Sequence, residues 1–313
     1  MPQSISNDMG SRHAQALVSH RGDGAGLVYQ GRKGSAGSAG RSSTTRSGAG
    51  FGWRAFALML AGALASQAQA EPFAYIANAG DNAVSIVDVA TRQVSATVAV
   101  GSRPFGVAKH PDGSRVYVAN QLSNTVSVIN TADNSVIQPS IPVGVGPRGV
   151  AVNPAGTKAY AANLDGNTVS VIDTATDAVS ATVVVGARPL ELGISPSGDR
   201  VYVGNYGDSS ISVIDGDTDQ VLHTVRGLSG PVGIAVHPLA NVVYVANGGT
   251  NQVVVFNAGV SPMEEITRVT VGSNPTSMAL TPSGQQLYVA NSGSDNVSIL
   301  DLSDRRAPTL SAT

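Results

Sequence analysis

The sequence predicts an all-β fold, a β-propeller of about six four-stranded blades or an incomplete set of seven. Three observations predict it: a repeat of about 42 residues, strand-like alternation within each copy, and turn residues between the strands. Only 13% of the 313 residues are charged and 36 are Gly, which is typical of strands joined by tight turns. The chain has no Cys, so we expect neither disulfides nor thiolate metal sites.

Six tyrosines mark the repeat. They are separated by 42, 43, 42, 42 and 44 residues and stand at Tyr75, Tyr117, Tyr160, Tyr202, Tyr244 and Tyr288. An Asn follows each of them by three residues, at Asn78, Asn120, Asn163, Asn205, Asn247 and Asn291. A β-sandwich does not predict so constant a period, whereas stacked propeller blades do.

Residues 148–185 show the strands of one copy. Residues 149–152 form a short apolar strand A, 158–162 strand B, 168–172 an alternating strand C, and 179–185 strand D. The A–B turn contains Pro and Gly, and the C–D turn begins with Asp, all of them favoured turn residues. Since one such sheet cannot bury both faces alone, we expect Val, Ile and Tyr to be buried between neighbouring blades.

The segments Tyr117-Val118-Ala119-Asn120, Tyr244-Val245-Ala246-Asn247 and Tyr288-Val289-Ala290-Asn291, with Asn-Thr-Val-Ser-Val-Ile at 124–129 and 167–172, resemble the YVTN-repeat β-propeller family over about 230 residues. The resemblance implies the fold and a surface-layer or periplasmic setting, but no particular activity. Family members often have seven blades. This chain offers six Tyr strands, with no candidate for strand A of the first copy in the mature chain and with residues 309–313 as the candidate for the last strand D. Either the ring closes with six blades and one imperfect seam, or the chain is truncated.

Residues 1–70 have the composition of a targeting region. Residues 1–50 are rich in Gly, Ser, Ala and Arg without an apolar period, and we expect them to be disordered or an over-extended gene start. In residues 51–70, Arg54 precedes an apolar run over 55–65 and the small-residue end Ala68-Gln69-Ala70, which is typical of a secretory signal peptide. The alternative is a membrane anchor, but the apolar run is shorter than the ~20 residues that a spanning helix needs. We therefore expect cleavage after Ala70 and a periplasmic or extracellular propeller of residues 71–313 with no membrane span.

Charge divides the chain at the same point. Residues 1–70 hold seven Lys and Arg and two acids, a net charge of +5, whereas residues 71–313 hold twelve and nineteen, a net charge of −7. An acidic domain is a poor partner for phosphate backbones, so nucleic acid is not an expected ligand.

The D–A loops and the inner ends of the A strands are predicted to ring one mouth of the central channel. They carry the candidate ligand-binding residues Arg103, Arg148, Arg188, Glu191 and Asn274. Three guanidinium groups at one mouth predict a site for a small anionic ligand or a protein partner, while the alternative is that they pair with nearby acids or cap carbonyls. Glu191 is the one acid on a predicted A strand and is a candidate for ion pairing or for proton transfer.

Other polar residues favour structural roles. His110 and His237 each precede the Pro of an A–B turn and are expected on the opposite mouth, and His223 lies on a predicted outer strand. The stretch 215–219 is similar to a calcium loop but lacks its Gly and Glu, and it aligns with an ordinary C–D turn. The sequence shows no nucleophile elbow, phosphate loop or His-rich metal motif, so we expect no catalytic residue, metal or cofactor.

These features favour an exported, non-enzymatic binding module. The alternative is a lactonase-like hydrolase or lyase that uses the channel mouth, which would need acids and histidines clustered there. A fold cannot decide between a binding module and an enzyme, because one fold hosts many functions. The choice between a binding module and an enzyme therefore depends on the residues of the predicted site.

Overall fold

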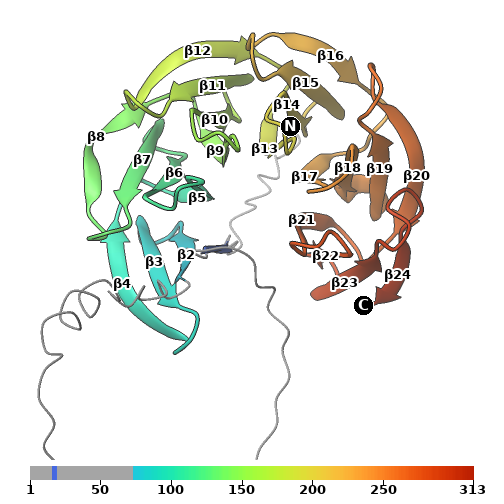
Figure 1. Ribbon diagram of the computed structural model, residues 1–313, viewed down its shortest axis with the longest axis horizontal. Coiled ribbons are helices and arrows are strands. Elements are labelled where there is room, and N and C mark those ends of the chain that lie inside the picture. The colour runs from blue at the N-terminus through green and yellow to red at the C-terminus, as the bar shows by residue number, and fades with distance from the viewer. Residues whose placement is uncertain (1–15, 20–72) are drawn as a thin grey trace, which may run out of the picture. The chain divides into compact units, whose positions relative to one another are not determined.

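The computed structural model describes residues 16–19, as backbone, and residues 73–313. Within them the chain forms six antiparallel sheets of four strands each, arranged as the blades of a β-propeller (Figure 1). The prediction of an all-β propeller is confirmed, and the one helical segment in the described part is a single turn at Gly248–Thr250.

Each blade runs from an inner strand A to an outer strand D. Blade 1 holds β1 (Ala16–Ser19), β2 (Phe73–Asn78), β3 (Ala83–Asp88) and β4 (Gln93–Ala99). Blade 2 holds β5 (Pro104–Lys109), β6 (Arg115–Asn120), β7 (Thr125–Asn130) and β8 (Val136–Pro142), and blade 3 holds β9 (Pro147–Val152), β10 (Lys158–Asn163), β11 (Thr168–Asp173) and β12 (Ala178–Val184). Blade 4 holds β13 (Pro189–Ile194), β14 (Arg200–Asn205), β15 (Ser210–Asp215) and β16 (Val221–Val225). Blade 5 holds β17 (Pro231–Val236), β18 (Val242–Asn247), β19 (Gln252–Asn257) and β20 (Glu264–Thr270), and blade 6 holds β21 (Pro275–Leu280), β22 (Gln286–Asn291), β23 (Asn296–Asp301) and β24 (Thr309–Ala312).

Strand A begins with Pro in blades 2 to 6. Pro has no N–H to donate to a ladder, so it is confined to strand ends, edges and bulges. In blade 2 the A–B register shifts between the pairs Pro104↔Asn120 and Val107↔Val118, and blades 4, 5 and 6 repeat the shift. The bulge bends the first residues of strand A away from regular pairing, at the end where the channel residues lie.

Five hydrophobic clusters join successive blades, as the repeat predicted. In each cluster the Tyr of strand B packs on the next blade; Tyr160 of blade 3, for example, packs with Val201 and Val203 of blade 4. The equivalent clusters join blades 1 and 2, 2 and 3, 4 and 5, and 5 and 6. Burying such a side chain stabilises the fold by roughly 1.5–3 kcal/mol.

Among the described residues, no such cluster joins blade 6 to blade 1. Tyr288 of blade 6 is 38% exposed, whereas Tyr244, its equivalent in blade 5, is 0% exposed. Val297 on the same face of blade 6 is 48% exposed, and its equivalent in blade 5, Val253, is fully buried. Blade 6 therefore presents an uncovered end face.

The inner strand of blade 1 is β1, which pairs antiparallel with β2 from Ala16↔Ile76 to Ser19↔Phe73. The sequence offered no candidate for this strand in the mature chain. In blades 2 to 6, strand A reaches strand B through a short turn, such as 110–114 in blade 2, whereas the whole of 20–72 lies between β1 and β2. Strand β1 therefore belongs to blade 1 by backbone pairing rather than by a local turn.

The remaining predictions for residues 1–72, disorder over 1–50 and a signal peptide over 51–70, lie outside the described residues except at β1. Across 16–19 and 73–313 there is no helix long and apolar enough to cross a membrane.

Candidate ligand site at one mouth of the channel

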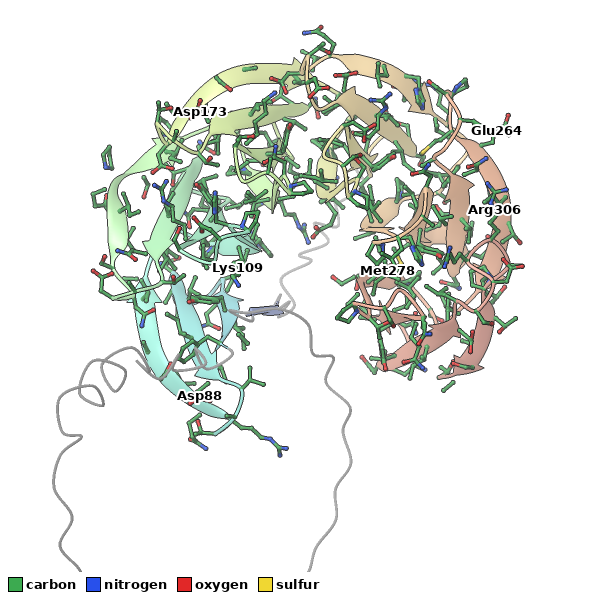
Figure 2. The ribbon with its side chains drawn as sticks, in the orientation of Figure 1. Asp88, Lys109, Asp173, Glu264, Met278 and Arg306 are labelled. Atoms are coloured by element: carbon green, nitrogen blue, oxygen red, sulfur yellow. The ribbon has the colours of Figure 1, made fainter. Side chains whose placement is uncertain are left out.

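The D–A loops and B–C loops share one mouth of the propeller. The backbone N–H of Gln121, in a B–C loop, donates to the carbonyl of Arg103 in the preceding D–A loop at 3.0 Å, and Tyr206 donates in the same way to Arg188 at 3.0 Å. Lys109 and Met278, on A strands, lie on the inner side of the ring, while Asp173 and Glu264 lie at its outer rim (Figure 2). The predicted blade layout, with strand A innermost, is therefore what the structure has.

Three predicted site residues occupy one strained position in their loops. Arg103, Arg188 and Asn274 each precede the Pro of an A strand and have φ of 56°, 53° and 48°, where Gly146 and Gly230 stand in the other two loops. Each of the three donates its backbone N–H to an Asn side chain of the preceding B–C loop, at 2.8, 2.9 and 2.8 Å. A left-handed conformation costs an ordinary residue about 1–2 kcal/mol, so these two arginines are held where Gly would be unstrained.

The residue after each Pro lines the channel. These five equivalent positions are Phe105, Arg148, Leu190, Val232 and Thr276, and together with Glu191 and Ser277 they surround a narrow cavity of about 50 Å³. Five A strands therefore converge on one small space. One cation and one acid face this space from adjacent strands, β9 and β13, and its other walls are apolar or hydroxylic.

Glycine allows the A strands to approach one another around this cavity. Gly149 occupies the place next to Arg148, and a Cβ there would lie 2.4 Å from the carbonyl oxygen of Leu190 on the next blade. Glu191 is the equivalent residue of blade 4. The acid is therefore held on an inner strand at a place where blades 2, 3 and 5 keep Gly.

Two arginines stack on one aromatic ring. The Cζ atoms of Arg103 and Arg148 lie 5.4 and 4.8 Å from the centre of the Phe105 ring, and Arg188 lies 5.7 Å from that of Tyr206. A guanidinium group over an aromatic ring gains roughly 0.5–1 kcal/mol at an exposed site. Sequence reasoning missed Phe105, although its equivalence to Arg148 in the repeat was a signal that could have found it.

Electrostatics link the arginines to one site. Burial lowers the pKa of the Arg148 guanidinium below its ordinary value, Glu191 acts in the opposite direction, and Arg103 and Arg188 lower it further. A partly buried cation with two further cations close enough to oppose its charge is a site where a bound anion relieves repulsion. Glu191, Arg103 and Arg188 therefore all lie within electrostatic reach of Arg148.

Asn274 lies at the same mouth but outside the cavity. It is exposed, and its Nδ2 donates to Ser292 Oγ at 2.7 Å, which ties its loop to blade 6. The geometry places it at the rim, and the ligand-binding role of all five residues stays a prediction.

The opposite mouth carries the two turn histidines. His110 Nε2 lies 2.7 Å from the carbonyl oxygen of Gly156, and His237 Nε2 lies 3.1 Å from that of Gly284, each in the next blade's A–B turn. Both histidines therefore tie blades together. His223, the third histidine in residues 73–313, accepts a hydrogen bond from the Met263 N–H at 3.2 Å on the outer strand β16.

The acidic turn over 215–219 is also engaged in structure. Asp219 pairs with Lys158 of blade 3 at 2.9 Å, and Asp215 lies 3.5 Å from Arg200 and accepts from two backbone N–H groups of its own turn. Within the described part of the chain, no group of three or more acidic, His or Cys side chains is placed to hold a metal ion. A larger, open groove of about 910 Å³ lies on the histidine mouth between the turns of blades 5 and 6; it is lined by Arg305 and Arg306 and lies away from Arg103, Arg148 and Arg188.

The six four-stranded blades, with their A strands around a common channel, define a β-propeller. The model of the YNCE-like beta-propeller family matches residues 53–145 and 137–307, and the chain belongs to that family. This agrees with the resemblance to YVTN-type propellers drawn from the repeats. No curated protein matches the sequence significantly.

Solved structures share the fold. Hydrazine synthase from Kuenenia stuttgartiensis is 22% identical with a TM-score of 0.54, over 74% of this chain and 92% of that one. A functionally unknown protein from Desulfotomaculum acetoxidans DSM 771 is 18% identical with a TM-score of 0.65, over 74% and 79% of the two chains. A chain of the mitotic checkpoint complex is 16% identical with a TM-score of 0.67, over 75% and 72%. At these identities the likeness supports the propeller fold alone.

Proposed function

We propose that this protein is exported and acts as a binding module for an anionic ligand or an acidic segment of a protein partner, at the channel mouth that carries the arginines. The main support for this proposal is Arg148. Its partly buried guanidinium faces a cavity between five strands, and Arg103 and Arg188 are close enough to lower its pKa. A guanidinium fork suits carboxylate or phosphate, and rigid loops reduce the entropy lost on binding.

The export part of the proposal rests on the sequence of residues 51–70 and on the acidic charge of residues 71–313. A domain that is exported without Cys needs no oxidative folding, and its net charge of −7 argues against nucleic acid as the ligand. A binding role is favoured over a lactonase-like activity because the three histidines of residues 73–313 lie away from the arginine mouth.

The test replaces Arg103, Arg148 and Arg188 together with Ser. Calorimetric titration with phosphate, succinate and a tetra-glutamate peptide is compared with wild type and with Arg306→Ser, which removes a cation from the opposite mouth. Loss of binding in the triple variant, with wild-type binding in the control and little change in melting temperature, supports the site. Unchanged binding, or a fall in melting temperature alone, shows that these arginines only hold the loops.

A further inference from the structure

The inner-strand position of blade 1 differs from the other five. Strand β1 fills it by pairing with β2, but the whole of 20–72 lies between the two strands, and β1 is on the other side of the expected cleavage point after Ala70. Cleavage there would separate β1 from the propeller. The edge of β2 would then have unpaired N–H and C=O groups, and such an edge is a template for another strand.

This edge lies beside the arginine site. Strand β1 contacts β5, the strand that carries Phe105 with Arg103 and Arg148 stacked on its ring. The Asn78 end of β2 leads into the B–C loop at the arginine mouth, and Ala16 pairs nearer that end than Ser19 does. A strand bound in the direction of β1 therefore has its amino-terminal side at the arginines.

The uncovered end face of blade 6 leaves the same position accessible from the side. On β21, the A strand of blade 6, Ser277 and Ala279 are exposed, and within the described residues no hydrophobic cluster joins blades 6 and 1. An extended peptide could reach β2 without passing along the channel.

We propose that the exported protein binds an extended peptide that adds as a strand to the edge of β2, with acidic residues on the amino-terminal side of the strand held by Arg103 and Arg148. The inference rests on both parts of the proposed function, export with cleavage after Ala70 and the anion site, and it names the ligand class of that site. Main-chain hydrogen bonds supply affinity in such strand addition, and side chains supply specificity. The sequence of β1, Ala-Leu-Val-Ser, is one that the position already accepts.

The experiment uses the protein recovered after export and a labelled heptapeptide, Asp-Asp-Gln-Ala-Leu-Val-Ser, in which two acids precede the β1 sequence. Fluorescence polarisation compares it with a peptide that has two lysines in place of the acids, and with one whose strand residues are N-methylated. The lysine peptide loses the charge-assisted hydrogen bonds, and the N-methylated peptide loses the backbone hydrogen bonds. Each is therefore expected to bind at least about tenfold more weakly than the acidic heptapeptide. The uncleaved chain, which retains β1, is expected to bind the heptapeptide more weakly than the exported form does.

The controls separate the two proposals. Equal binding of the acidic and lysine peptides, or of wild type and Arg148→Met, overturns the anion site. Equal binding of the N-methylated peptide, or of the free Asp-Asp dipeptide, overturns strand addition. An exported product that retains residues 16–19 also overturns strand addition, because β1 then already occupies the edge of β2. Arg306→Ser is the matched control for loss of a cation and is expected to bind as wild type does.

Discussion

Lys158 of blade 3 and Asp219 of blade 4 form an ion pair across the blade boundary, with Nζ and Oδ2 2.9 Å apart. Lys158 Nζ also donates to the Gly216 carbonyl at 2.9 Å, so the pair locks strand β10 onto the next blade's C–D turn. Arg115 and Asp177 repeat the contact between blades 2 and 3 at 3.1 Å. These two boundaries are therefore polar at the turn end and apolar in the middle.

Breaking the Lys158–Asp219 pair should destabilise the propeller. The two side chains are 24% and 16% exposed, so solvent screens them only in part, and Lys158→Met is expected to cost about 1–3 kcal/mol by leaving Asp219 unpaired. The control is Arg226→Met, since Arg226 is 71% exposed and lies 3.9 Å from Asp208, where a surface pair contributes about 0–1 kcal/mol. Urea unfolding of both variants checks this, and equal losses of stability would contradict it.

The two tyrosines at the end of the ring should differ in their contribution to stability. Tyr244 is fully buried and donates to the Arg305 carbonyl of blade 6 at 3.0 Å, whereas the partly exposed Tyr288 donates to Gln286 of its own blade at 3.2 Å. Truncating a buried aromatic side chain to Ala costs about 3–5 kcal/mol, and we expect that for Tyr244→Ala.

Tyr288→Ala should cost about 1 kcal/mol, because Tyr288 is partly exposed and, within the described residues, no hydrophobic cluster of a next blade packs on it as on its equivalents. Thermal unfolding of Tyr244→Ala and Tyr288→Ala compares the two losses of stability. Similar losses at the two sites would show that blade 6 is covered in solution, either by blade 1 or by another molecule.

Stability should fall as the pH drops below the pKa of an unfolded His. His237 is fully buried; its Nδ1 accepts from the Leu239 N–H at 3.0 Å, and burial lowers its pKa below the ordinary value of 6.5. At low pH the folded state then binds fewer protons than the unfolded chain does. The stability that neutral His237 contributes is therefore present above about pH 6.5 and declines below it. The slope has an upper limit of about 1.4 kcal/mol per pH unit for each such His.

His237→Asn should flatten part of this acid slope, since Asn153 occupies the equivalent turn in blade 3 and accepts from two backbone N–H groups there. His223, whose pKa burial also lowers, accounts for a further part. Unfolding free energies of wild type and variant between pH 5 and pH 8 provide the measurement. Identical slopes in the two proteins would show that His237 does not titrate in this range.

The exported protein should begin at Glu71. Cleavage after Ala68-Gln69-Ala70 is expected from the small-residue end that follows the apolar run over 55–65. Mass spectrometry of the product from the periplasm or the medium checks the mass and the first residue. Recovery of the full chain in the membrane fraction would contradict the signal-peptide prediction.

The repeat made most of the fold predictable from the sequence. Tyr and Asn at a period of about 42 residues mark every B strand from β2 to β22, and the Pro-Gly and Asp turns placed their neighbours correctly. Strand β1 could not be predicted, because so short a strand with no turn to β2 carries no local signal. Local sequence is informative where a strand joins its partner through a short turn, and uninformative where the partners are as far apart in the chain as β1 and β2.

The candidate site was partly predictable. The repeat placed Arg103, Arg148 and Arg188 at one mouth because they occupy neighbouring positions around the Pro of strand A. It could not indicate that Arg103 and Arg148 share the ring of Phe105, since that contact joins side chains of two blades. The rim position of Asn274, outside the cavity, likewise depends on packing rather than on spacing.

The most direct test of the anion site is a crystal structure of residues 71–313 with the tetra-glutamate peptide bound. We expect carboxylate density within hydrogen-bonding distance of the Arg148 guanidinium, between Arg103 and Arg188. Peptide density confined to the opposite mouth, in the groove between blades 5 and 6, would contradict it.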